Sequence, residues 1–204
     1  MTRIISGLAG SLRLEVPKAG TRPTSDRVRE AIFSALESWG MVEDARVLDL
    51  YGGSGALGLE AASRGAREVT VVEKHPQAAQ VASRNAKTVL HAWRESTGAP
   101  RISVERQSVQ AFLDREAEHV AGGSAQPWDV VMLDPPYDLG ETELAQNLAR
   151  VAEIISASSV VLVERSSRSP EPTLPPELAP LKDRNYGETV LWWSELSQTE
   201  TPQS

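Results

Sequence analysis

Short apolar segments alternate with amphipathic helical segments from residue 45 to residue 164, and this alternation limits the fold more than any other feature. Five segments rich in Val, Ile and Leu fit buried strands: 45–50, 68–73, 101–107, 128–134 and 158–164. The segments between them fit helices: 58–65, 76–90, 109–119 and 141–155. Buried strands separated by helices are typical of a parallel sheet covered by helices on both faces. The sequence therefore predicts an α/β protein with a mostly parallel sheet.

The N-terminal region lies outside this alternation. Residues 3–7 and 11–17 are two short apolar stretches that could pair as a hairpin. Residues 26–39 fit a helix with one apolar face, and Thr24 or Ser25 can cap its start.

The alternation also stops after residue 165. The proline-rich segment 167–180 predicts a loop, and residues 184–196 predict a final strand or a hairpin around Gly187. In domain terms, we expect an N-terminal β-hairpin and loop at 1–24, one α/β domain at 25–195 and a disordered polar tail at 196–204.

Composition excludes several classes of protein. The 204 residues include no cysteine and only three histidines, which lack metal-ligand spacing, so we expect no disulfide scaffold, no cysteine nucleophile and no metal site. No apolar run approaches the roughly 20 residues of a membrane span, and the first ten residues lack the apolar core of a signal peptide. We expect a soluble, cytoplasmic protein that does not enter a membrane.

The charge is unevenly distributed. The chain has a net charge of −7, but residues 1–30 carry six basic residues against three acidic ones. A locally basic face on an acidic protein can bind a polyanion. Arginines of this region are the candidates: Arg3, Arg13, Arg22, Arg27 and Arg29. The alternative is structural, because Arg27 and Arg29 lie on the predicted helix and could instead pair with Asp26 or Glu30.

A glycine-rich turn follows the first strand of the alternation. Asp49 lies at the end of that strand, and four glycines come next: Gly52, Gly53, Gly55 and Gly58. Glycines let backbone N–H groups approach a ligand at the start of a helix. Glu73 ends the following strand, where a carboxylate can accept hydrogen bonds from ribose hydroxyls. The pattern predicts a cofactor that contains a nucleoside; the alternative is a tight turn without a ligand.

Two cofactor classes fit this turn, a dinucleotide and S-adenosylmethionine. An anion just before the glycines would repel a pyrophosphate. The ammonium and sulfonium of S-adenosylmethionine are cationic, so Asp49 favours this second class. Asp49 could equally be a structural cap of the loop.

The tetrapeptide Asp134-Pro135-Pro136-Tyr137 follows the fourth strand. Ligands of open α/β sheets bind at the carboxyl ends of the strands, so the tetrapeptide should lie beside the glycine turn. The prolines remove two N–H donors, which leaves the Asp134 carboxylate and the Pro135 carbonyl as acceptors suited to an amine. Tyr137 offers an aromatic face to a base. The alternative is a turn that ends a buried strand, with Tyr137 in the core.

These motifs, with RIISG, RPTSDRVREAIF, GALGLEAASRGA and a late YGETVLWW, resemble the bacterial 16S ribosomal RNA (guanine-N2)-methyltransferase family over roughly residues 3–194. The resemblance implies a Rossmann-like class I methyltransferase fold with a mostly parallel seven-stranded sheet and a small N-terminal extension. It implies an enzyme that uses S-adenosylmethionine to methylate the exocyclic N2 amine of one guanine in 16S ribosomal RNA, within the small ribosomal subunit. We expect a monomer.

The resemblance also implies which residues carry each role. Those matching the cofactor site are Asp49, Tyr51, Gly52, Gly53, Ser54, Gly55 and Glu73, with Ser108 at the position near the adenine, where Asp or Asn is more frequent. Those matching the catalytic motif are Asp134, Pro135, Pro136 and Tyr137. The N-terminal arginines would then contact RNA.

Three other functions remain open at this stage. One is a methyltransferase for another amine, such as DNA adenine N6 or a protein glutamine, although DNA enzymes usually carry a further recognition domain. Another is a nicotinamide-dependent oxidoreductase, which would need a substrate domain that is not visible. The third is an RNA-binding assembly factor without activity, against which the intact Asp-Pro-Pro-Tyr motif argues.

Overall fold

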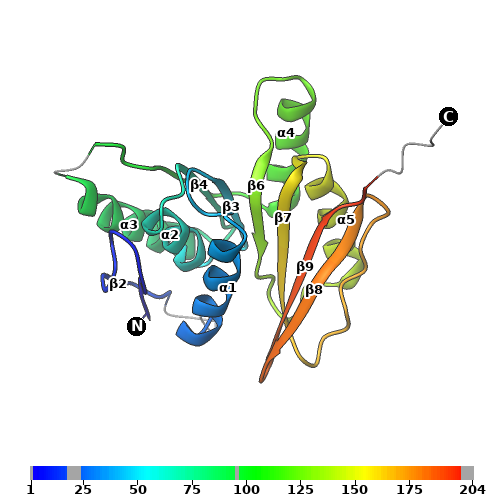
Figure 1. Cartoon of the computed structure of the whole chain (residues 1–204), viewed down its shortest axis with the longest axis horizontal. Helices are drawn as coiled ribbons and strands as arrows, with labels where there is room; N and C mark the ends of the chain where they lie inside the picture. The colour runs from blue at the N-terminus through cyan, green and yellow to red at the C-terminus, as the bar shows by residue number, and fades with distance from the viewer. Residues whose placement is uncertain (1, 18–23, 95–96, 199–204) are drawn as a thin grey trace.

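Seven strands form one sheet in the order β5–β4–β3–β6–β7–β9–β8. The computed structural model describes residues 2–17, 24–94 and 97–198 (Figure 1). The strands of the sheet are β3 (Arg46–Leu50), β4 (Glu68–Val72), β5 (Arg101–Glu105), β6 (Trp128–Leu133), β7 (Ile155–Ser166), β8 (Leu178–Tyr186) and β9 (Thr189–Leu196). The neighbours from β5 to β7 pair in parallel, whereas β9 is antiparallel to both β7 and β8. The predicted mostly parallel seven-stranded sheet is confirmed.

Helices cover both faces of this sheet, as predicted. They are α1 (Asp26–Ser38), α2 (Ala56–Ser63), α3 (Pro76–Leu90), α4 (Val109–Ala121) and α5 (Glu141–Ala152), with a 3₁₀ turn at His91–Trp93. Strand β6 shows the alternation that makes this possible. Its Val130 and Met132 pack in the cluster that holds the apolar faces of α1 and α2, while Val131 and Leu133 pack with α4 and α5. Figure 1 shows α1, α2 and α3 on one side of the central strands and α4 and α5 on the other.

Two of the boundaries that differ from the prediction concern apolar residues that join the sheet. The predicted helix 141–155 ends at Ala152, and strand β7 begins at Ile155. Ile155 pairs with Trp128 in β6, and burial of this residue beside the sheet outweighs continuation of the helix. The predicted loop 167–180 ends early, because β8 starts at Leu178. Pro180 is tolerated there because β8 is an edge strand and its register shifts after this residue.

The N-terminal hairpin is packed against the α/β domain. Its strands are shorter than predicted, Thr2–Arg3 (β1) paired with Arg13–Leu14 (β2). Ile4, Ala9 and Leu14 are buried against Leu59 of α2 and against α3. The N-cap of helix α1 is Ser25, whose Oγ accepts a hydrogen bond from the Val28 N–H. A membrane span is ruled out for every helix of the described residues, because none is long and apolar enough.

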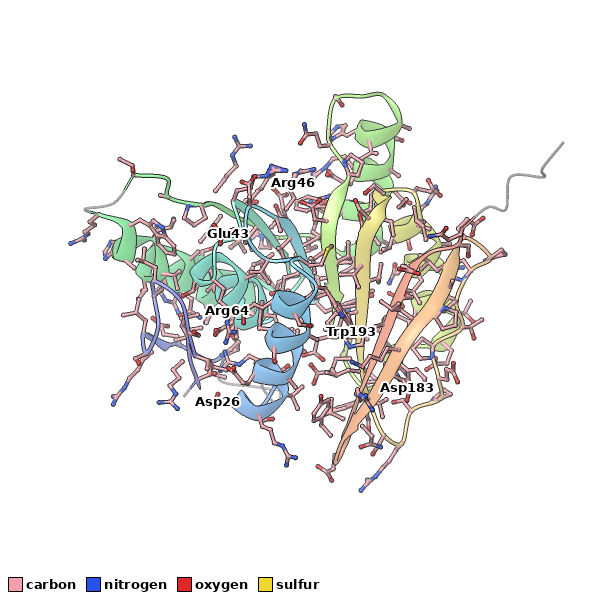
Figure 2. The ribbon with its side chains drawn as sticks, in the orientation of Figure 1. Asp26, Glu43, Arg46, Arg64, Asp183 and Trp193 are labelled. Carbon is pink, nitrogen blue, oxygen red and sulfur yellow. The ribbon has the colours of Figure 1, made fainter. Side chains whose placement is uncertain are left out.

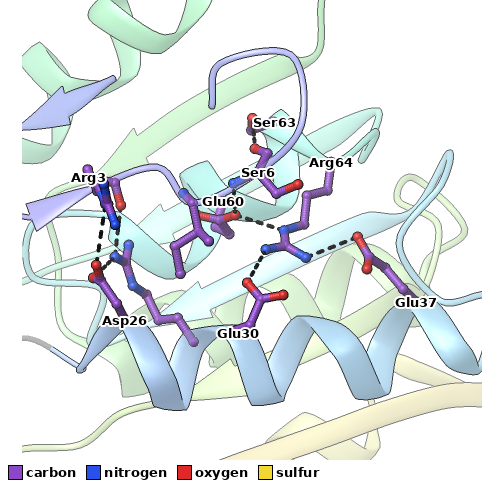
Figure 3. Close-up of polar contacts among 10 residues, drawn as sticks. Arg3, Ser6, Asp26, Glu30, Glu37, Glu60, Ser63 and Arg64 are labelled. Atoms are coloured by element: carbon purple, nitrogen blue, oxygen red, sulfur yellow. Dashed lines mark hydrogen bonds and ion pairs between the residues drawn. The ribbon is translucent and has the colours of Figure 1, made fainter. Parts of the chain in front are cut away.

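A buried carboxylate on α2 holds this hairpin in place. Glu60 accepts hydrogen bonds from the backbone N–H groups of Ile5 at 2.7 Å and Ser6 at 3.0 Å. The Nε of Arg64 donates to the same carboxylate at 2.7 Å, and Arg64 continues to Glu30 and Glu37 on α1 (Figure 3). The hairpin, α2 and α1 are therefore linked through one charged network whose centre, Glu60, is fully buried.

Replacing Glu60 by Ala should lower the free energy of unfolding by about 2–4 kcal/mol, because the N–H groups of Ile5 and Ser6 lose their acceptor and the buried Arg64 side chain loses its fully buried partner. Urea-induced unfolding measures this change. Glu37→Ala is the matched control: it removes a half-exposed partner of the same arginine and should cost less than about 1 kcal/mol. Equal losses for the two variants would show that Glu60 does not anchor the hairpin.

Candidate active site

Four carboxylates lie at the carboxyl ends of four adjacent strands. They belong to strands β4, β3, β6 and β7 and are Glu73, Asp49, Asp134 and Glu164. None of the four has an ion-pair partner among the described residues. The opposite edge of the sheet differs. There Arg46, at the start of β3 and labelled in Figure 2, pairs with Glu68 at 2.9 Å and stacks over Trp128. Among the described residues, the four acids at the carboxyl edge therefore lie together without a neutralising ion pair.

Strand register places these side chains on one face. Leu50 is the partner of Leu133, and Leu133 is the partner of Val163. The side chains of Leu50, Leu133 and Val163 all pack on the face of the sheet that α4 and α5 cover. Since side chains alternate along a strand, the neighbouring Asp49, Asp134 and Glu164 face the side of α1, α2 and α3.

Asp49 is fully buried and only half satisfied. Its Oδ2 accepts a hydrogen bond from the Gly58 N–H at 2.9 Å, while its Oδ1 is buried and has no partner among the described residues. Burial raises the pKa of Asp49 to about 7, and the charges of Asp134 and Glu73 add to this effect. One oxygen therefore caps the loop, as one alternative predicted, and the other is available to a cation or an N–H donor.

The glycines of the turn are required by close contacts and by backbone conformation. A Cβ on Gly52 would lie 2.4 Å from Val71 Cγ1, and one on Gly58 would lie 2.9 Å from Val69 Cγ1. Gly53 and Gly55 have positive φ angles of 55° and 78°, which glycine adopts without strain. The turn therefore leaves a cradle of bare backbone at the start of α2.

Tyr51 and Ser54 are fixed by contacts to more distant helices. Tyr51 has a φ of 61°, unusual for a side chain of its size. Its hydroxyl accepts a hydrogen bond from Asn147 Nδ2 of α5 at 2.5 Å. The carbonyl of Ser54 accepts one from Asn85 Nδ2 of α3 at 2.9 Å. Both flanks of the turn are thereby held to the helices on either side of the sheet.

Glu73 contacts the same turn. Its Oε2 accepts from the Gly53 N–H at 3.0 Å and its Oε1 accepts from the His75 N–H at 2.7 Å. Each carboxylate oxygen can accept a second hydrogen bond, so the predicted contact with ribose hydroxyls remains compatible with this geometry.

The Asp-Pro-Pro-Tyr segment leaves β6 beside the glycine turn. The Asp134 N–H donates to the Leu50 carbonyl at 3.3 Å, so the start of the motif is tied to β3. Burial raises the pKa of Asp134 to about 6, and a hydrogen bond from Thr24 acts in the opposite direction. Pro135 is buried and Pro136 is exposed. Tyr137 is 73% exposed, so the alternative that placed it in the core is wrong.

Ser108 has a structural task. It is the N-cap of α4, and its Oγ accepts a hydrogen bond from the Ala111 N–H at 3.2 Å. The residue follows β5 at the same edge of the sheet as the other candidates. Its contact with an adenine stays a prediction.

The five arginine candidates divide into four groups. Arg29 is fully buried, and its Nη2 donates to the Arg3 carbonyl and to Asp26, so its assignment to RNA contact is wrong. Arg3 is exposed but lies 3.5 Å from Asp26. Arg13 and Arg27 are exposed and have no partner among the described residues, and Arg22 lies outside the described residues.

Sequence reasoning missed two residues of this site, Thr24 and Glu164. Thr24 Oγ1 lies 3.3 Å from Asp134 Oδ2 and 3.0 Å from Glu164 Oε2. The sequence did carry a signal for Glu164: the segments VVMLD and VVLVE both place an acid directly after an apolar run. In adjacent parallel strands such acids become neighbours.

The strand order, together with the glycine turn after β3 and the motif after β6, defines a Rossmann-like class I methyltransferase fold. The family described as Conserved hypothetical protein 95 matches residues 2–195. The chain belongs to this family. Its relatives in Escherichia coli and Haemophilus influenzae are named as ribosomal RNA methyltransferases.

Two curated relatives and one solved structure show the extent of the similarity. The chain is 33% identical over 174 residues to ribosomal RNA small subunit methyltransferase D of Escherichia coli K12, covering 85% of this chain and 79% of the relative. It is 32% identical over 187 residues to the protein of the same name from Haemophilus influenzae, covering 91% and 89%. The structure of a hypothetical protein from Thermus thermophilus is similar with a TM-score of 0.76 and 30% identity, covering 96% and 100%.

Gly52→Ala should destabilise the protein by about 1–3 kcal/mol, because the added methyl group overlaps a fully buried valine. Urea-induced unfolding at fixed pH gives the value. Gly140→Ala is the control, since a Cβ there meets nothing within 4 Å. A Gly52→Ala variant as stable as the control would mean that the turn can open without cost.

Proposed function

We propose that this protein transfers a methyl group from S-adenosylmethionine to the exocyclic N2 amine of a guanine in 16S ribosomal RNA. One observation carries the proposal: a half-satisfied buried carboxylate with a bare glycine cradle lies next to an Asp-Pro-Pro-Tyr acceptor motif on the adjacent strand. The names of the relatives support ribosomal RNA as substrate, and the sequence motifs support guanine N2. We further propose that it acts as a monomer in the cytoplasm on RNA of the small ribosomal subunit.

The turn after β3 fits this cofactor. Asp49 Oδ1, which is buried without a partner among the described residues, would accept a hydrogen bond from the ammonium of the cofactor or lie near its sulfonium. Glu73 would hold the ribose hydroxyls, and Tyr51, Gly52, Gly53, Ser54 and Gly55 would line the remaining contact with their backbone. When bound, S-adenosylmethionine supplies a methyl group on a cationic sulfur. The acids at this edge have no ion-pair partner among the described residues, and such acids suit a cationic ligand and disfavour a pyrophosphate.

The Asp-Pro-Pro-Tyr motif would prepare the amine. The lone pair of an exocyclic amine is delocalised into the ring, so the amine is a poor nucleophile. The Asp134 carboxylate and the Pro135 carbonyl would each accept a hydrogen bond from one N–H of the amine. These two bonds would turn the nitrogen lone pair toward the methyl donor, so the contribution to catalysis is one of orientation. Pro136 keeps the backbone rigid, and the exposed Tyr137 ring stacks on the base. The alkylated nitrogen is acidic, so no separate general base is needed.

The decisive experiment supplies radiolabelled S-adenosylmethionine with undermethylated small ribosomal subunits, naked 16S RNA, DNA or a protein mixture. Label in RNA, followed by nucleoside mass spectrometry that identifies N2-methylguanosine, is the expected result. Label in adenine or in protein would replace the proposed target with another amine. Binding of NAD, together with no methyl transfer to any acceptor, would overturn the proposal.

Asp134→Ala should lower turnover at least about 100-fold, because the amine loses the acceptor that orients it. Affinity for S-adenosylmethionine, measured by calorimetry, should stay within a few-fold, since Asp134 is assigned to the amine and not to the methyl donor. Turnover near that of the unmodified enzyme would remove Asp134 from the catalytic role.

Replacing Arg13 and Arg27 by Gln should weaken binding to 16S RNA. It should also reduce the slope of log affinity against log salt by about 0.7–0.9 for each phosphate that is no longer bound. Filter binding at several salt concentrations measures the slope. Arg67→Gln is the control, because this arginine precedes β4 at the opposite edge of the sheet. An unchanged slope in the double variant would place the RNA surface elsewhere.

A further inference from the structure

Glu164 is a second acid beside the proposed catalytic carboxylate, with no role in the motifs or in the function proposed so far. It follows Val163 on β7, and Asp134 follows Leu133 on β6. Val163 and Leu133 are register partners, so the two acids occupy neighbouring positions at the ends of paired strands. Glu164 is only 8% exposed. Burying a carboxylate next to another is costly unless a proton or a hydrogen bond relieves it.

Thr24 connects the two acids. Its hydroxyl oxygen lies 3.0 Å from Glu164 Oε2 and 3.3 Å from Asp134 Oδ2. A hydroxyl group has one hydrogen to donate, so it can donate to only one of these carboxyl groups at a time. The second contact becomes a hydrogen bond only if the other carboxyl group carries a proton and donates it to the Thr24 oxygen.

The surroundings decide which acid carries the proton. Burial raises the pKa of Glu164 to about 8, and the charge of Asp134 contributes, while Thr24 acts in the opposite direction. Asp134 has the lower of the two raised pKa values, about 6. Other acidic groups on this face are Asp49 of β3 and Glu73 at the end of β4, and none of the four acids has an ion-pair partner among the described residues. Because the proposed function needs Asp134 as an acceptor, we assign the shared proton to Glu164, whose charged form is disfavoured by burial and by the neighbouring Asp134.

The remaining carboxyl oxygens point to the purpose of this arrangement. Thr24 contacts Asp134 through Oδ2, and Asp134 Oδ1 has no hydrogen-bond partner among the described residues. An acceptor fixed through one oxygen and open at the other is suited to orient an amine.

We propose that Glu164 and Thr24 are positioning residues for Asp134: protonated Glu164 donates to the Thr24 hydroxyl, which donates to the ionised carboxylate of Asp134. This one-way chain keeps Asp134 charged, fixes its rotamer and removes the second negative charge from the site. The inference rests on the proposed function, because it assigns Asp134 to the amine of the substrate.

Conservative and disruptive variants separate this role from a merely structural one. Glu164→Gln keeps an N–H donor for Thr24 and should retain turnover within about 3-fold near neutral pH. Glu164→Ala and Thr24→Val break the chain and should lower kcat at least about 10-fold, with little change in KM for S-adenosylmethionine. Thr24→Ser keeps the hydroxyl and should behave like Glu164→Gln.

The pH profile gives the second readout. In the unmodified enzyme, kcat should fall as the pH rises through about 8, where Glu164 loses its proton. This alkaline limb should disappear in Glu164→Gln, because an amide does not titrate. A Gln variant as inactive as the Ala variant, or one that keeps the alkaline limb, would overturn the proposal.

A titration of the free protein keeps the test independent of the RNA substrate. Carboxyl ¹³C chemical shifts of glutamate-labelled protein, assigned by the signal that is absent from Glu164→Gln, should show Glu164 titrating well above the ordinary glutamate range. Ordinary titration of Glu164 rejects the proton chain even if the enzyme methylates RNA. Elevated titration without any RNA methylation instead rejects the proposed function and leaves the chain as a property of the fold.

Discussion

The close approach of the glycine turn to strands β3 and β4 is the contact on which the site depends. Gly52 and Gly58 leave no room for a Cβ against Val71, Val69 and Asp49. Because these positions are bare, the N–H of Gly58 reaches Asp49 and the N–H of Gly53 reaches Glu73. Each bond stabilises a carboxylate that burial would otherwise penalise. The same backbone thus builds the turn and keeps two acids at the sheet edge.

The four acids at this edge are stabilised in two different ways. Asp49 accepts a hydrogen bond from the N–H of Gly58 in the first turn of α2, and Glu73 accepts from the N–H groups of Gly53 and His75. Among the described residues, no backbone N–H donates to the side chain of Asp134 or Glu164, and the two acids share the Thr24 hydroxyl. The first pair suits a cationic ligand with ribose hydroxyls, while the second pair presents an acceptor to an amine. The division along the sheet matches a reaction with two separate ligands.

Much of the fold was predictable, because buried parallel strands read as continuous apolar runs and their alternation with helices fixes the architecture. The glycine turn and the Asp-Pro-Pro-Tyr motif were found because they stand directly after such runs. Arg29 was misassigned because charge in a sequence does not reveal burial: only the structure shows its contacts with the Arg3 carbonyl and Asp26. Glu164 was overlooked because only the β6–β7 register places it beside Asp134. The start of β8 at Leu178 was missed because Pro180 indicated a loop, whereas an edge strand tolerates a proline.

The N-terminal segment is connected to the α/β domain at three points, two of which reach the candidate site. Glu60 holds Ile5 and Ser6. Asn85 bonds both to the backbone of Glu15 and to the Ser54 carbonyl of the glycine turn, and Thr24 reaches Asp134. Removing residues 1–20 would therefore disturb the proposed cofactor turn as well as basic residues, so a loss of RNA binding after truncation would not by itself assign these arginines to RNA contact. Arg13 and Arg27 have no partner among the described residues, so substituting them changes surface charge while leaving these three connections in place.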